Sequence, residues 1–163
     1  MGSRSEVLAY MKALGFTEGI DTFKGRLQIQ KSVLLLNEFG AKLGFAHHWY
    51  IHGPYSPALT RELFNQTLPT TTPIELDAEK LRIVNDMRNF LGEDLYSVDS
   101  LELIVSLIYL IKGGPGFGFG SKHDILKFLR EAKPHFSQEQ MDGAWTKIER
   151  SGRWQAYLTS LRE

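Results

Sequence analysis

A glycine-rich loop is the first place in this sequence where chemistry could reside. Residues 113–120 read GGPGFGFG and are followed by Ser121 and Lys122. A phosphate-binding P-loop needs a glycine, four residues and then Gly-Lys-Ser/Thr directly after a strand. Here serine precedes lysine, and a helix is expected before the loop. The pattern therefore favours a connector between two helices, with Phe117 or Phe119 packed into the core, over a nucleotide site.

Histidines and carboxylates are the other residues that could bind a metal or catalyse a reaction. His48 and His52 would share one face of a strand, with His47 beside them. Metal sites need three or four ligands, and no carboxylate lies close by in the sequence. The chain has no cysteine and no Gly-x-Ser-x-Gly turn, and the carboxylates of residues 75–102 are scattered as on a solvated surface. We expect no metal, no cofactor and no enzymatic activity; a triad assembled from distant positions and a nucleotide site on the glycine-rich loop stay open as weaker hypotheses.

Polar and cationic residues gather around a predicted corner, and these are the candidate binding residues. An aromatic, extended stretch at residues 45–52 reaches a tight corner at Gly53-Pro54. Ser56 then caps a helix that has Pro57 at its first position. The free N–H groups at a helix N-terminus can bind phosphate. The candidates for contacting nucleic acid or a partner protein are Arg26, Gln28, Lys31, His52, Tyr55, Ser56 and Arg61.

Two interpretations of these seven residues compete. In a DNA reader, the arginines and lysine would contact phosphates, while Gln28 and Tyr55 would position the backbone or touch base edges. The simpler interpretation is that the corner residues only fix the turn, with the cationic side chains solvated. A continuous basic face around Arg26, Lys31 and Arg61 would favour DNA, whereas an apolar groove would favour a protein partner.

Helices must position these residues, because apolar side chains recur at helical spacing through most of the chain. A short helix at residues 6–14 is expected to begin after Ser5 and to end at Gly15, and a central core helix follows at residues 25–39. Residues 99–102 and 137–140 read as capping-box starts. Residues 66–73 read as a connector, and no convincing hairpin occurs over residues 66–95. Further helices are expected at residues 56–64, 77–91, 99–112, 121–132, 137–151 and 154–161.

Composition and charge describe a globular chain without a strong electrostatic field. The 163 residues are 42% hydrophobic and have a net charge of zero, whereas a strong non-specific DNA binder is usually more basic. The absence of cysteine suits an intracellular protein, and no signal peptide is evident. The longest apolar run, residues 101–111, contains Glu102 and is too short to span a bilayer. We expect a soluble, cytoplasmic protein without a membrane segment.

Two segments of the sequence carry a family resemblance. Residues 25–31 (GRLQIQK) and 52–59 (HGPYSPAL) resemble the YwgA-like proteins and, more distantly, the SocA-type antitoxin (Panacea) domain. Both groups carry a Leu-Gln-Lys-like helix and a downstream Gly-Pro-Tyr/Val corner that leads into a helix. The resemblance covers residues 24–64 well and implies a helix-turn-helix or winged-helix-like domain in a regulator, and the antitoxin relatives act through protein partners. This chain differs in lacking a wing hairpin after the third helix and in adding a helical C-terminal half.

The sequence therefore predicts a mainly α protein. A helix-turn-helix or winged-helix-like part with a short extended segment is expected at residues 1–70, and a helical part at residues 71–163 is expected to pack with it as one domain. We expect a DNA-binding transcriptional regulator, and the alternative is a protein-interaction module of the antitoxin or adaptor kind. The expected partner is thus DNA or a protein, with a homodimer left open and no membrane.

Overall fold

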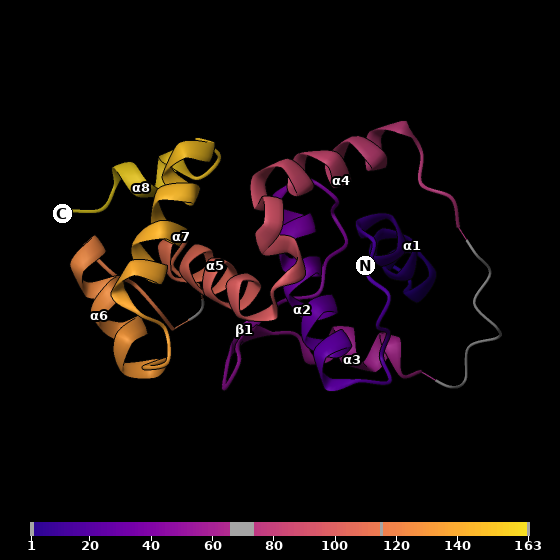
Figure 1. The fold of residues 1–163 in the computed structure, drawn as a ribbon, viewed down its shortest axis with the longest axis horizontal. Helices are drawn as coiled ribbons and strands as arrows, with labels where there is room; N and C mark the ends of the chain where they lie inside the picture. The colour runs from indigo at the N-terminus through magenta and orange to yellow at the C-terminus, as the bar shows by residue number, and fades with distance from the viewer. Residues whose placement is uncertain (1, 66–73, 115, 163) are drawn as a thin grey trace. The chain divides into compact units, whose positions relative to one another are not determined.

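The part of the chain that the structure describes is mainly helical with one small sheet, which confirms the predicted mainly α class (Figure 1). The computed structural model describes residues 2–65, 74–114 and 116–162. The chain divides into two compact units, Met1–Leu101 and Glu102–Glu163, so the first unit extends beyond the N-terminal part expected at residues 1–70. The elements are α1 (Arg4–Leu14), α2 (Phe23–Glu38), β1 (His48–Tyr50), β2 (Gly53–Tyr55), α3 (Pro57–Leu63), α4 (Ala78–Leu91), the 3-10 helix η1 (Gly92–Tyr96), α5 (Val98–Ile111), α6 (Lys122–Ala132), α7 (Gln138–Ser151) and α8 (Gln155–Thr159).

Helices α1, α2 and α4 pack against one another in the first unit. Val7, Tyr10 and Leu14 form the buried face of α1, because residues three and four apart lie on the same side of a helix. Helix α2 is buried without interruption from residue 28 to residue 36, as expected for the central core helix. Each fully buried aliphatic side chain contributes about 1.5–3 kcal/mol. This burial makes α2 the rigid element that supports strands β1 and β2.

The two strands form an antiparallel hairpin, and its turn differs from the predicted corner. Tyr50 lies opposite Gly53, so the turn consists of Ile51 and His52. The prediction of a corner at Gly53-Pro54 was wrong, since both residues belong to β2. Gly53 has a φ of 82°, a conformation that glycine adopts without the steric cost of a side chain. Proline is tolerated in β2 because the sheet has only two strands.

The helix after the hairpin begins as predicted. Ser56 is the N-cap of α3, its Oγ accepts a hydrogen bond from the N–H of Leu59 at 3.3 Å, and Pro57 is the first helical residue. Helix α4 also confirms a prediction, because a helix and not a hairpin occupies residues 78–91, with Asp77 as its N-cap. The predicted connector at residues 66–73 lies outside the described residues.

Three helix starts differ from their predictions by a few residues. Helix α1 is capped by Ser3 and not by Ser5, and α2 begins at Phe23 after a Thr22 cap. Helix α5 begins at Val98, where the N–H of Ser100 donates to the Oγ of Ser97. In each case a hydroxyl a few residues upstream caps the first turn. Several serines and threonines could serve as caps, and only the approach of the backbone decides which one does.

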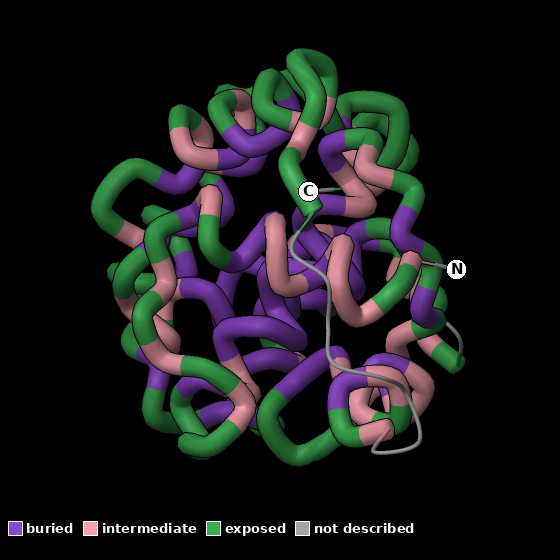
Figure 2. Tube along the Cα trace, turned by 90° about the vertical axis from the view of Figure 1, so that its right-hand side faces the viewer, coloured by how far each residue is buried: buried purple, intermediate pink, exposed green. Residues whose placement is uncertain are grey.

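The second unit contains most of α5 together with α6, α7 and α8. Residues 101–111 of α5 are buried on all sides, as predicted, and Figure 2 maps the burial of every described residue along the chain. Ser121 caps α6, and Ser137 with Gln140 forms the predicted capping box of α7. In the glycine-rich loop, Phe117 packs on the ring of Phe128 with centroids 5.1 Å apart. The described part of this loop thus acts as a connector between α5 and α6.

Candidate functional site

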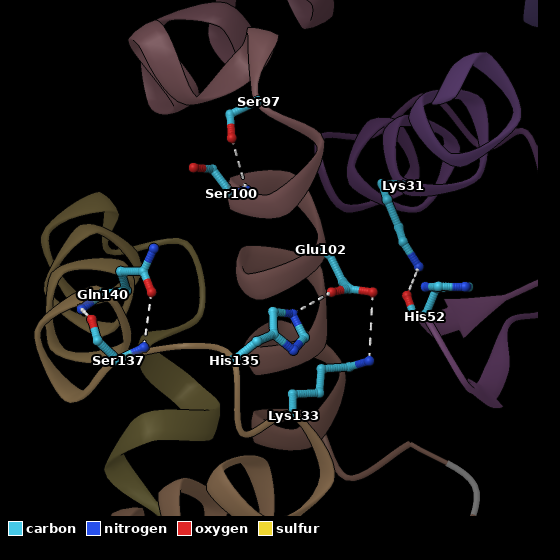
Figure 3. A network of polar contacts seen from close by, with 9 residues as sticks. All are labelled: Lys31, His52, Ser97, Ser100, Glu102, Lys133, His135, Ser137 and Gln140. Carbon is cyan, nitrogen blue, oxygen red and sulfur yellow. Dashed lines mark hydrogen bonds and ion pairs between the residues drawn. The ribbon is translucent and has the colours of Figure 1, made fainter. Parts of the chain in front are cut away.

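Two buried polar residues of α2 hold the hairpin and the start of α3. Gln30, 3% exposed, donates through Nε2 to the carbonyl oxygen of Ser56 at 3.0 Å, and the N–H of Ser56 donates back to Gln30 Oε1 at 2.8 Å. Lys31, 1% exposed, donates through Nζ to the carbonyl oxygens of His52 and Pro54, the latter at 3.0 Å. Figure 3 shows Nζ of Lys31 directed at the His52 carbonyl. Buried backbone groups are costly when unpaired, so these contacts fix the hairpin to α2.

A pair of hydroxyl groups extends this network into α3. The hydroxyls of Tyr55 and Thr60 are hydrogen bonded at 2.6 Å, and Gln30 Nε2 also donates to Thr60 Oγ1 at 3.0 Å. Gln30 therefore contacts both the residue that caps α3 and a residue one turn further along it. The half-buried ring of Tyr55 is held in one orientation by this bond.

His47 contacts α2 from the loop that precedes the hairpin. Its Nε2 lies 3.2 Å from the carbonyl oxygen of Gln30. Burial lowers the pKa of His47 to about 4, although hydrogen bonds to the backbone at Gln30 and Phe45 oppose the shift. The imidazole is thus neutral at pH 7. A carbonyl oxygen only accepts, so His47 donates to Gln30 in the tautomer that carries its proton on Nε2.

An apolar groove of about 480 Å³ lies along the hairpin and the adjoining turns of α2 and α3, and we call it the hairpin groove. All of its lining residues belong to the first unit. The polar residues in the lining are Arg26, Gln30, Lys31, His52, Tyr55 and Thr60. Its apolar walls are formed by Phe23, Leu27, Tyr50, Ile51, Leu63 and Phe64.

Several apolar side chains of the hairpin groove are unusually exposed. Phe23 is 54% exposed, Tyr50 47%, Ile51 87% and Phe64 44%. The described residues include eight exposed large hydrophobic side chains, and these four line a single groove. Single exposed apolar residues are ordinary on a protein surface, whereas a contiguous group of them is typical of interaction sites and ligand-binding grooves.

The charge inside the hairpin groove is cationic. Arg26 is half-buried, donates through Nη1 to the carbonyl oxygen of Ile20 at 2.9 Å, and lies with Cζ 6.0 Å from the centroid of the Phe23 ring. The same Phe23 ring meets His52 edge-on, with centroids 5.2 Å apart. No aspartate or glutamate is among the lining residues.

The structure brings four of the seven sequence-predicted residues together in the hairpin groove, namely Arg26, Lys31, His52 and Tyr55. The interpretation in which the cationic side chains are only solvated is wrong for Lys31, because its ammonium group is buried against the hairpin carbonyls. A contact between Lys31 and a phosphate would require these hydrogen bonds to break.

The other three predicted residues lie outside the groove lining. Gln28 is 6% exposed and Ser56 is fully buried, where its hydroxyl caps α3. Arg61 is exposed on α3, one turn before Phe64. The predicted residues therefore divide into groove residues, structural residues and one exposed cation.

Sequence reasoning missed Gln30 and the apolar walls. A glutamine next to a lysine in the apolar stretch of α2 is a usable signal, because buried polar groups need partners. No comparable signal marks Phe23, Ile51 or Phe64, since an apolar residue near a turn or a helix end is ordinary. Only the fold shows that these three lie together.

The comparisons with known proteins identify no relative of this chain. A scan against protein-family models matches no family, and searches of curated proteins and of solved structures find no similar protein. The resemblance to the YwgA-like proteins and to the SocA-type antitoxin domain thus stays a prediction.

Among the residues that the structure describes, no group of three or more His, Cys, Asp or Glu side chains could hold a metal ion. In the same ranges, no helix has both the length and the apolar character needed to cross a membrane.

Proposed function

We propose that this protein is a protein-interaction module that binds a segment of a partner protein in the hairpin groove. The observation that carries the proposal is the gathering of exposed Phe23, Tyr50, Ile51 and Phe64 around one groove. Contiguous apolar surface marks interaction sites, and aromatic residues and arginine are enriched at the energetic centres of protein interfaces. A cytoplasmic location, expected from the sequence, is part of this proposal.

The rigidity of the groove walls supports the proposal. The hairpin wall is tied to α2 through Gln30 and Lys31, and Tyr55 is tied to Thr60 of α3. Walls that are ordered before binding reduce the entropy that a partner must overcome. The volume of 480 Å³ also falls within the range of about 300–1,000 Å³ that is typical of binding pockets.

DNA binding stays the alternative, but fewer observations support it. Two of its proposed contact residues, Gln28 and Lys31, are buried. The first turn of α3 is already capped by Ser56, and α3 has only seven residues. The net charge of zero provides no general attraction for a polyanion.

The proposal is tested by selecting a phage-displayed library of random peptides on the immobilised protein. We expect enriched peptides that bind the Ile51→Ser variant at least about tenfold more weakly than the parent protein. Ile51 is the best position for this test, because it is 87% exposed and its truncation removes little from the folded core.

A matched control makes the same change outside the groove. Leu81 of α4 is 44% exposed and is not a lining residue, so the Leu81→Ser variant should bind the selected peptides as the parent does. A selection without enrichment, or peptides that bind the parent and the Ile51→Ser variant equally, would contradict the proposal. A salt-sensitive DNA mobility shift that is lost in the Arg61→Glu variant would favour the alternative.

A further inference from the structure

We infer that the partner segment carries a carboxylate beside its apolar anchor, and that Arg26 in the hairpin groove binds this carboxylate. The inference rests on the proposed protein-binding function and adds the charge of the partner to it. The occupant of the groove is therefore an acidic, apolar segment of another protein.

The guanidinium group of Arg26 retains most of its hydrogen-bonding capacity. The arginine side chain has five N–H donors, and among the described residues that of Arg26 makes one hydrogen bond, from Nη1 to the carbonyl oxygen of Ile20. Its position 6.0 Å from the centroid of the Phe23 ring adds a cation–π contact that restrains the side chain. A planar guanidinium group that is restrained and has unused N–H donors can bind both oxygens of a carboxylate.

The surroundings of Arg26 strengthen this pairing. Arg26 is half-buried in a groove with apolar walls, where charges interact more strongly than in open water. An anchor residue seated against Phe23 or Leu27 would therefore place its acidic neighbour close to the guanidinium group. The carboxylate would replace water that solvates Arg26 in the free protein.

Arg61, which lies near the hairpin groove, also favours a negatively charged partner. Arg61 is exposed one turn from the wall residue Phe64, whereas Lys24, next to Phe23, is paired with Glu18 at 4.0 Å. The acidic residues Glu18 and Asp21 precede the groove in sequence but are not among its lining residues. A cationic groove attracts an acidic segment and disfavours a basic one.

The first experiment compares the peptides that are selected on three proteins. On the parent protein, enriched peptides should carry aspartate or glutamate next to a large apolar residue. On the Arg26→Glu variant the preference should change to lysine or arginine. The matched control is Arg82→Glu, the same charge reversal at an exposed position of α4 outside the groove, and it should select the same acidic peptides as the parent.

The second experiment is a double-mutant cycle on one selected peptide, with affinities measured by fluorescence anisotropy. Changing Arg26 to Gln should weaken binding about tenfold, as expected for a charge-assisted hydrogen bond. Replacing the acidic residue of the peptide by its amide should cause a similar loss, and the two changes together should cause no further loss. Arg26→Lys, which keeps the charge but not the planar fork, should lose part of the affinity, and circular dichroism checks that each variant is folded.

The outcomes separate this inference from the proposed function. Peptides that depend on Ile51 but lack acidic residues would overturn the inference and leave the proposed function intact. Losses that multiply in the double-mutant cycle would do the same. A selection in which no peptide depends on Ile51 would overturn both.

Discussion

The side-chain amide of Gln30 pairs with the backbone of Ser56 as one strand pairs with another, because it donates to the carbonyl oxygen and accepts from the N–H of the same residue. The two residues are 26 positions apart and belong to the two halves of the motif that resembles the YwgA-like proteins. Lys31 makes a second connection between the same halves, through the carbonyl of Pro54. In this structure the two halves of the motif contact each other, and their hydrogen bonds attach the hairpin to α2.

The Gln30–Ser56 pair leads to a first prediction about stability. Changing Gln30 to Leu leaves the buried N–H and carbonyl of Ser56 without this partner, so the free energy of unfolding should fall by about 1–3 kcal/mol. Urea denaturation measures the loss. The control is Gln28→Leu, because the Gln28 side chain makes no hydrogen bond within the described ranges, and its effect should be close to zero. Equal losses in the two variants would show that the pair has no special role.

A second prediction concerns Lys31. Methionine has a similar length but no donor, so Lys31→Met leaves the carbonyl oxygens of His52 and Pro54 without the ammonium group. We expect faster hydrogen exchange at the hairpin amides and weaker binding of groove-dependent peptides, because the hairpin forms one wall of the groove. Exchange followed by NMR measures the first effect and fluorescence anisotropy the second. Unchanged protection of the hairpin would mean that Lys31 does not hold it.

Local chemistry explains which features of the fold were predictable. Ser56 followed by Pro57 defines a helix start from two adjacent residues, and Ser137 with Gln140 does so within one turn. Gly152 ends α7 in a left-handed conformation, which a glycine after a helical pattern also predicts. These features need no information from distant parts of the chain.

The features that could not be predicted depend on residues distant in sequence. Gln28 and Gln30 lie on a helix that is buried on several sides, so periodicity cannot show which one reaches Ser56. Lys31 violates the rule that lysines are exposed, and its burial is explained only by carbonyl groups of the hairpin. The hairpin turn was misplaced because Gly53, which has a φ of 82°, lies in β2 directly after the turn and not at its centre.

A third prediction concerns the pH dependence of stability. The pKa of His47 is lowered to about 4 in the folded protein, against 6.5 as its ordinary value. Between these two values the unfolded chain binds a proton that the folded protein does not bind. The free energy of unfolding should therefore fall as the pH is lowered from 6.5 towards 4, by at most about 3 kcal/mol from this residue.

Urea denaturation at several pH values tests this prediction with a matched pair of variants. His47→Gln removes the titrating group, so stability should depend less steeply on pH than in the parent between pH 6.5 and 4. His48→Gln changes the neighbouring histidine, which is exposed, and should keep the steep dependence of the parent. A parent slope that survives in the His47→Gln variant would assign the pH dependence to other groups.

The fourth prediction concerns a buried ion pair of the second unit. Glu102 and Lys133 have side chains that are 7% and 3% exposed, with Oε1 and Nζ 3.5 Å apart, and the more exposed His135 lies 3.5 Å from the other carboxylate oxygen (Figure 3). Lys133→Met leaves the carboxylate of Glu102, which is 7% exposed, without this ammonium partner. The free energy of unfolding should fall by about 3–5 kcal/mol, as measured by urea denaturation.

A double variant distinguishes the cost of an unpaired charge from the value of the pair. Replacing Glu102 by Leu and Lys133 by Met together removes both charges, so much of the stability that either single change loses should return. The His135→Gln variant should change stability by less than about 1 kcal/mol, because the imidazole is 56% exposed and water can replace its contact. If the losses of the two single changes instead add up in the double variant, each residue stabilises the unit through contacts other than this pair.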